Sequence, residues 1–194
     1  ISVVALLGTI LLAAAGPAAA QGVQITPLGS HDGEFCKFDR AMILEDPIGT
    51  RILYDPGRSV AGPDDPRLGP IDVILVSHMH GDHVGNIHII KTNQGSCAKP
   101  LTPVKALPNT NSVNIALAKK AVIVTGSEMP KFFASKLKAL GADPKASQLV
   151  RFGASKKVNG VSLTTVPAAH SNGIGGSMIG GELGALLDLS GLTA

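Results

Sequence analysis

Three histidines and an aspartate crowd into six consecutive positions of this chain, directly after an apolar run. Residues 71–76 read Ile-Asp-Val-Ile-Leu-Val, which is typical of a buried strand, and the next residues read Ser-His-Met-His-Gly-Asp-His. In an extended segment alternate side chains share a face, so His78, His80 and Asp82 can point together. His83 then enters from the turn. Neutral imidazoles and a carboxylate suit a borderline ion such as zinc, so the spacing predicts a metal site at a strand end rather than a solvated loop.

This motif resembles the signature of the metallo-β-lactamase superfamily, whose members are mostly metal-dependent hydrolases. The resemblance implies that His78 and His80 hold a first metal ion, together with a third histidine much later in the chain. It implies that Asp82 and His83 help to hold a second ion, and that Asp82 is catalytic, orienting the attacking water and carrying its proton. The implied cofactor is one or two Zn²⁺ ions, with manganese or iron as alternatives.

The later histidine that matches this pattern is His170, in the segment Val-Pro-Ala-Ala-His-Ser. It follows residues 161–166, whose alternation of β-branched and polar residues predicts a strand. A histidine after a strand is, by itself, more often structural than a ligand. The resemblance implies a ligand role, because the family's third histidine lies just past such a strand. Ala-His-Ser is similar to the lactonase-like branch, whereas the glyoxalase-type and antibiotic-hydrolysing branches usually carry Gly-His-Thr.

The rest of the chain predicts an α/β fold, because strand-like and helix-like segments alternate. Asp-Pro-Ile-Gly at residues 46–49 predicts a hairpin turn. Strands are expected at residues 23–28, 41–45, 51–54 and 121–125, and helices at residues 84–90, 112–120 and 129–140. The resemblance implies the αββα sandwich of the superfamily, of which this chain would contain mostly the N-terminal half plus the start of the second half.

Both ends of the chain carry signals of their own. Residues 3–15 are almost wholly apolar yet short for a membrane span, and three alanines precede Gln21 as in a signal-peptidase site. We therefore expect a signal peptide at residues 1–20, a metallo-β-lactamase-like domain at residues 21–194, and a secreted or periplasmic protein with no membrane span after processing. The first residue is not Met and no Lys or Arg precedes Lys37, so we expect the chain to be cut at its start.

After the third histidine the resemblance implies a bridging aspartate and a final histidine. Residues 171–194 contain no histidine, and their one aspartate, Asp188, lacks the usual Gly-Asp-Thr setting. We therefore expect these two ligands to be missing and the second metal site to be incomplete. The predicted function is a secreted hydrolase that uses a metal-activated water on a lactone, ester or phosphoester. A non-catalytic metal-binding pseudoenzyme, or a gene fragment, is the alternative.

Composition limits the partners. Some relatives cleave RNA, so a nuclease is a further alternative, but a formal net charge of +3 and an aromatic content of 3% give it little support. A small-molecule substrate is therefore expected. Cys36 and Cys97 would meet an oxidising compartment if the signal peptide is real, and a disulfide and two separate buried thiols are both open. The sequence does not predict the oligomeric state.

Overall fold

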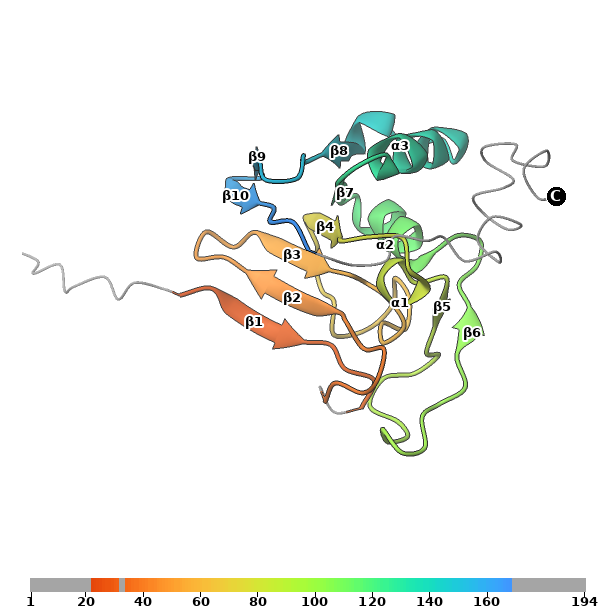
Figure 1. Cartoon of the computed structure of the whole chain (residues 1–194). Coiled ribbons are helices and arrows are strands. Elements are labelled where there is room, and N and C mark those ends of the chain that lie inside the picture. The colour runs from red at the N-terminus through yellow and green to blue at the C-terminus, as the bar shows by residue number, and fades with distance from the viewer. Residues whose placement is uncertain (1–21, 32–33, 169–194) are drawn as a thin grey trace, which may run out of the picture.

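A mixed six-stranded sheet organises the part of the chain that the computed structural model describes, residues 22–31 and 34–168 (Figure 1). Its strand order is β1-β2-β3-β4-β7-β8. The first three strands pair antiparallel, whereas β3, β4, β7 and β8 run parallel, which confirms the predicted α/β class. The strands span Gln24–Pro27, Met42–Glu45, Arg51–Tyr54, Val73–Val76, Val122–Thr125 and Ser147–Leu149. The predicted signal peptide and His170 lie outside the described residues.

The predicted hairpin between β2 and β3 is confirmed. The carboxylate of Asp46 accepts hydrogen bonds from the amides of Ile48 and Thr50, at 3.1 and 2.8 Å. Gly49 has φ +87°, a left-handed conformation that glycine adopts without steric cost. The turn places Arg51 opposite Glu45 in the register, and the two side chains form an ion pair.

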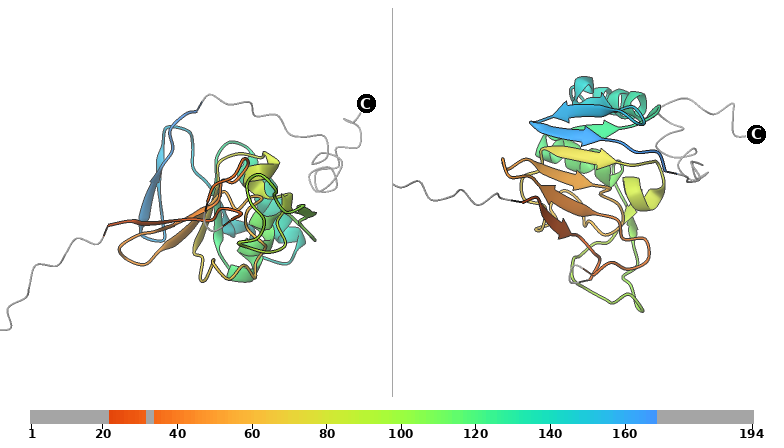
Figure 2. Two further views of the ribbon diagram at one scale, coloured as in Figure 1. Left: turned by 90° about the horizontal axis from the view of Figure 1, so that it is seen from below. Right: turned by 60° about the vertical axis from the view of Figure 1, so that its left-hand side comes forward.

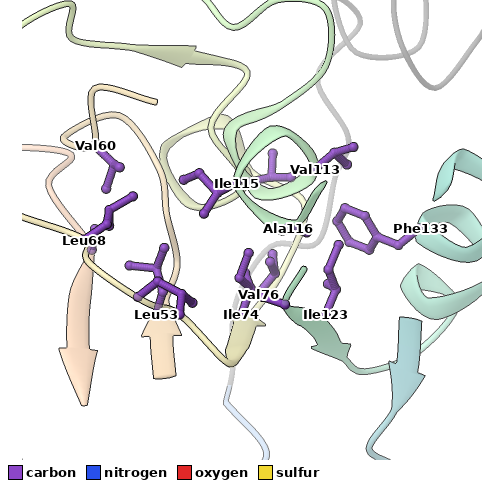
Figure 3. Close-up of a cluster of buried hydrophobic side chains, with 14 of the residues drawn as sticks. Leu53, Val60, Leu68, Ile74, Val76, Val113, Ile115, Ala116, Ile123 and Phe133 are labelled. Atoms are coloured by element: carbon purple, nitrogen blue, oxygen red, sulfur yellow. The ribbon is translucent and has the colours of Figure 1, made fainter. Parts of the chain in front are cut away.

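Two helices cover one face of the sheet, and a β-hairpin covers part of the other (Figure 2). Helices α2 (Asn111–Lys119) and α3 (Met129–Ala139) pack their apolar sides on the central strands. Phe133 and Ile123 are fully buried there (Figure 3), and such burial stabilises the fold by on the order of 2 kcal/mol per side chain. The hairpin on the opposite face consists of β9 (Ser155–Val158) and β10 (Val161–Thr164).

The prediction of a helix at residues 84–90 is wrong. The chain instead forms one short helix, α1 (Gly81–Val84), followed by strand β5 (Ile87–His88), which pairs with β6 (Val104–Lys105). Gly85 ends α1 with φ +76°, and a Cβ at this position would lie 2.6 Å from Pro56 O and from Asn111 Cβ. The apolar residues after the motif, half-buried Ile87 and buried Ile89, therefore lie outside any helix.

Strand β8, the 3₁₀ turn η1 (Pro144–Ala146) and strand β9 carry no sequence signal strong enough to have been predicted. They read Ser-Gln-Leu, Pro-Lys-Ala and Ser-Lys-Lys-Val, which are polar segments. Their conformation comes from pairing with neighbouring strands and not from local propensity. No helix among the described residues is both long and apolar enough to cross a membrane.

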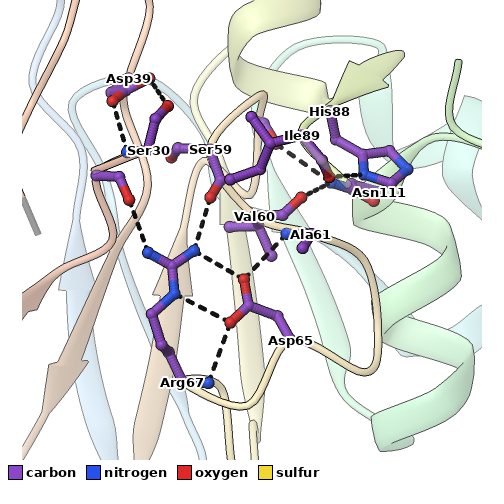
Figure 4. Close-up of polar contacts among 12 residues, drawn as sticks. Ser30, Asp39, Ser59, Val60, Ala61, Asp65, Arg67, His88, Ile89 and Asn111 are labelled. Carbon is purple, nitrogen blue, oxygen red and sulfur yellow. Dashed lines mark hydrogen bonds and ion pairs between the residues drawn. The ribbon is translucent and has the colours of Figure 1, made fainter. Parts of the chain in front are cut away.

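The loop between β3 and β4 is fixed by a buried ion pair. The Arg67 guanidinium donates to Gly29 O, Ser59 O and the carboxylate of Asp65, each by a 2.7 Å bond, and so lies between two loops (Figure 4). Burial on its own would raise the pKa of Asp65. Hydrogen bonds from Arg67 and from the amide of Ala61, with the guanidinium charge, outweigh burial and hold that pKa below its ordinary value of 3.8.

Replacing Asp65 with Asn should lower the free energy of unfolding at pH 7 by about 3 kcal/mol, because Arg67 would keep a buried charge without its partner. The depressed folded-state pKa means that this stabilisation is present above the unfolded-state pKa of about 3.9 and is lost as the pH falls through the lower folded-state value. Urea unfolding at pH 7 and at stepwise lower pH measures both effects. Asp64→Asn, at an exposed neighbour, is the control; equal losses in the two variants would contradict the role of the ion pair.

Candidate functional site

The predicted cluster lies where β4 leaves the sheet, and its second half is helical. His80 has an extended backbone, with φ −68° and ψ 147°, and precedes α1, while Asp82 and His83 lie within α1. The amides of His83 and Val84 both donate to His80 O at 3.0 Å, which closes the helical turn. The expectation that Asp82 shares an extended face with the first two histidines is therefore wrong, because a helical turn rotates successive side chains by about 100° instead of alternating them.

The three imidazoles of the motif do come together. His78 Nε2 lies 2.9 Å from His80 Nδ1, and the ring centroids of these two residues are 4.5 Å apart. The ring of His83 lies 4.0 Å from that of His78, centroid to centroid. Two nitrogens bound to one tetrahedral zinc ion at about 2.05 Å would be about 3.3 Å apart. The observed pair is within half an ångström of that separation, so these two nitrogens alone are spaced nearly as two ligands of one zinc ion would be.

The buried carboxylate of Asp55 holds this cluster to the sheet. Asp55 Oδ1 accepts a hydrogen bond from the Ser77 amide at 2.7 Å, and Oδ2 contacts Ser77 Oγ at 2.8 Å and His83 Nδ1 at 2.7 Å. With Nδ1 engaged, His83 has only Nε2 left for another partner, an arrangement known from carboxylate–histidine–metal groups. Sequence reasoning did not select Asp55 as a site residue. The available signal was its position at the end of β3, the strand beside β4 in the sheet.

The backbone and neighbour of Asp55 are also unusual. Asp55 has φ +44°, which is uncommon for a residue other than glycine, and its side chain is fully buried. Burial raises the pKa of the adjacent Tyr54, and the charge of Asp55 raises it further. The Tyr54 phenol therefore stays protonated at physiological pH and can only act as a neutral hydrogen-bonding group.

Asp82 faces a cavity beside the histidines. Its Oδ2 lies 3.4 Å from Arg40 Nε and 3.6 Å from His83 Nε2. A cavity of about 240 Å³ opens next to it, lined by Phe38, Arg58, Gly81, Asp82, Asn86 and Ile87. The carboxylate thus has one oxygen engaged by neighbours and lies within reach of a small molecule.

Four further residues named from the sequence are His170, His88 and the two cysteines. His170 lies outside the described residues, and within residues 22–31 and 34–168 no three His, Cys, Asp or Glu side chains are arranged so that they could hold one metal ion. His88, four positions after the end of α1, lies in β5 and has its Nδ1 2.6 Å from Ile89 O, away from the cluster. Of the two alternatives for the cysteines, the structure shows the disulfide, Cys36–Cys97.

Comparison with known proteins identifies the family of this sequence. The model of the β-lactamase superfamily domain matches residues 50–186, a range that contains the histidine cluster, Asp55 and His170. The chain belongs to the metallo-β-lactamase superfamily. The matched range includes β4, α1 and the histidine motif between them.

Curated relatives in this superfamily carry related names. The chain is 29% identical over 148 residues to a UPF0173 metal-dependent hydrolase of Pyrococcus furiosus, which covers 74% of this chain and 51% of that protein. It is 34% identical over 122 residues to a UPF0173 metal-dependent hydrolase of Polynucleobacter asymbioticus, covering 54% of this chain and 41% of that protein. The chain therefore spans about half the length of the curated relatives it matches.

Close packing between Gly57 and α1 gives a test of how the cluster is held. A Cβ at residue 57 would lie 1.8 Å from Asp82 O, which is backbone and can move only with the helix. Gly57→Ala should therefore displace α1 and lower the free energy of unfolding by about 2 kcal/mol, measured by urea unfolding. Gly22→Ala, where no atom lies within 4 Å of the added Cβ, is the matched control. An unchanged stability in Gly57→Ala would show that this contact does not position the helix.

Proposed function

We propose that this protein is a metal-dependent hydrolase whose first metal ion is held by His78, His80 and His170. Asp82 and His83 supply part of the ligand set of a second ion. The observation that carries the proposal is the close approach of His78 Nε2 and His80 Nδ1, at 2.9 Å, beside a third imidazole that Asp55 orients. The names of the relatives, which are metal-dependent hydrolases, support it. We propose zinc as the ion, because imidazole nitrogens with carboxylate oxygens are its common protein ligands.

A divalent metal bound here supplies Lewis acidity and brings the pKa of water towards neutrality. The protein's own groups do the rest. Asp82 orients the attacking water and accepts its proton at Oδ1, because Oδ2 already contacts Arg40 and His83. Asp55 fixes the ring plane of His83 through Nδ1, which leaves Nε2 on the side of Asp82, 3.6 Å from its Oδ2.

The proposed substrates are lactones, esters or phosphoesters of small size. The cavity beside Asp82 has a volume of about 240 Å³, which suits a small molecule more than a polymer. The Ala-His-Ser segment around His170, which is similar to the lactonase-like branch of the family, favours lactones and esters.

Replacing His78, His80 or His170 with Ala should lower both bound metal and hydrolysis of a generic ester, lactone or phosphodiester. Asp82→Asn should lower the rate by on the order of 10² while the first metal is retained, because the amide cannot accept the proton. Metal content by plasma mass spectrometry and initial rates measure the two effects. His88→Ala is the control, since His88 contacts a backbone carbonyl away from the cluster. Unchanged metal in the histidine variants would contradict the ligand assignment, and full metal occupancy without hydrolysis would favour a non-catalytic metal-binding protein.

We also propose that the protein is exported and works in an oxidising compartment, secreted or periplasmic. Two features support this: the apolar leader-like residues 1–20 and the disulfide between Cys36 and Cys97. Disulfides persist where thiols are not kept reduced. The disulfide therefore agrees with the leader sequence.

Expression of the complete gene followed by mass spectrometry of the cell fractions tests this proposal. We expect a mature chain that begins at Gln21, found outside the cytoplasm, in which an alkylating reagent labels neither Cys36 nor Cys97 until a reductant is added. The reduced and then alkylated sample is the control. A mature chain that retains residues 3–15, or that reacts with the reagent without reduction, would contradict export to an oxidising compartment.

A further inference from the structure

Two small cavities meet at one pair of side chains beside the proposed active site. The cavity next to Asp82 and a second one of about 230 Å³ are both lined by Phe38 and Arg58. The Arg58 guanidinium carbon lies 5.7 Å from the centre of the Phe38 ring. An aromatic face and a guanidinium thus share one wall, directly beside the carboxylate to which we assign the proton transfer.

Arg58 carries a charge that the described part of the chain does not neutralise. Its side chain is half-buried, and within residues 22–31 and 34–168 its guanidinium forms no ion pair and no side-chain hydrogen bond. The other arginines that line the neighbouring loops are engaged: Arg67 by Asp65, and Arg40 by Asp82. A half-buried guanidinium with five donors is a strong binding group for a carboxylate or a phosphate.

Other charges near Phe38 increase this positive surplus. Lys37 Nζ lies 5.1 Å from the centre of the Phe38 ring, on an exposed side chain. The nearest acidic group in the same turn, Asp39, is buried, and its carboxylate is occupied by three donors: Ser30 N and Ser30 Oγ at 2.7 Å and Cys36 N at 3.0 Å. The Asp82 carboxylate, which lines the first cavity, is paired with Arg40, so Lys37 and Arg58 together outweigh Asp39 near Phe38 and favour an anion there.

Both halves of this wall are held rigidly by the surrounding structure. On one side, Arg58 O accepts a hydrogen bond from the Ile89 amide at 2.9 Å, and Ser59 O accepts one from Arg67 at 2.7 Å. On the other side, the turn that carries Phe38 is tied through Cys36 to Cys97. Scaffolds of this kind pre-organise a binding group and reduce the entropy lost when a ligand binds.

The backbone of Phe38 gives a second, independent sign of function. Its φ is +75°, a left-handed conformation that costs a non-glycine residue of order 1 kcal/mol, and its side chain is 40% exposed. The strain is not balanced by burial of the ring. This backbone conformation places the Phe38 ring between the two cavities, where the ring can contact the apolar part of a ligand.

We propose that Phe38 and Arg58 form an anion subsite, which selects substrates that carry a negatively charged group next to an apolar part. This proposal rests on the proposed hydrolase function, because it places the hydrolysable bond of the same substrate beside Asp82. The substrate class is an ester or lactone with a carboxylate or phosphate a few bonds from the scissile carbonyl. The charged group contacts Arg58, and the chain that joins it to the reacting bond lies along Phe38.

A pair of matched esters tests the subsite in the full chain. Mono-para-nitrophenyl succinate carries a carboxylate, whereas para-nitrophenyl butyrate has the same acyl length and no charge. Arg58→Gln should raise KM for the succinate ester by about tenfold and leave KM for the butyrate ester within about twofold, as expected from the loss of one hydrogen-bonded ion pair. Arg58→Lys should lie between wild type and Arg58→Gln. Arg151→Gln, at an exposed arginine that lines neither cavity, is the matched control.

Binding of succinate by calorimetry, with metal-loaded and with chelator-treated protein, separates this proposal from the hydrolase assignment. We expect Arg58→Gln to weaken succinate binding about tenfold in both forms, with an unfolding temperature like that of wild type. Binding of succinate through Arg58 without hydrolysis of either ester, a lactone or a phosphodiester would overturn the hydrolase assignment and keep the subsite. Hydrolysis of both esters with the same KM in wild type and Arg58→Gln would overturn the subsite and keep the hydrolase. Equal effects of Arg151→Gln would also overturn it.

Discussion

The buried carboxylate of Asp55 is the interaction on which the candidate site depends. It lies at the end of β3 and joins three parts of the chain: its own strand, the turn that leaves β4 through Ser77, and helix α1 through His83. The carboxylate itself is fully buried, where leaving it without partners would be costly. Gly57, two residues further on, has no side chain, and this allows the backbone of Asp82 to pack against it. Loss of this carboxylate would therefore disturb the position of the histidines as well as the stability of the sheet.

The loops around the site are each held in place by a specific interaction. The Arg67–Asp65 ion pair fixes the connection from β3 to β4, and the Cys36–Cys97 disulfide ties the turn around Phe38 to the long segment that follows β5. The cavity beside Asp82 is formed where these two anchored loops meet α1. Substrate choice in a site of this kind depends on the loop side chains, whereas the proposed metal chemistry depends on the strand end.

The sequence predicted the local elements well where the pattern was strong. Strand β3, the Asp46 hairpin and helix α3 agree with the expected ranges to within one or two residues, because their turns and apolar periodicity are local properties. It failed at residues 84–90, where a helix was expected. Gly85 must accommodate Pro56 and Asn111 from elsewhere in the chain, and no local pattern encodes those contacts. The polar strands β8 and β9 were missed for the same reason, since their neighbours determine their conformation.

The sequence by itself determined the α/β class, the crowding of His78, His80, Asp82 and His83 after a strand, and the chemistry that such donors favour. These follow from composition and spacing along the chain. Only the tertiary structure decided that Asp82 lies on a helical turn, that Asp55 orients His83, and that Arg58 and Phe38 line one cavity with Asp82. Each of these depends on the pairing of strands β3 and β4 and on contacts between loops that are distant in sequence. A single sequence carries no local pattern for contacts of that kind.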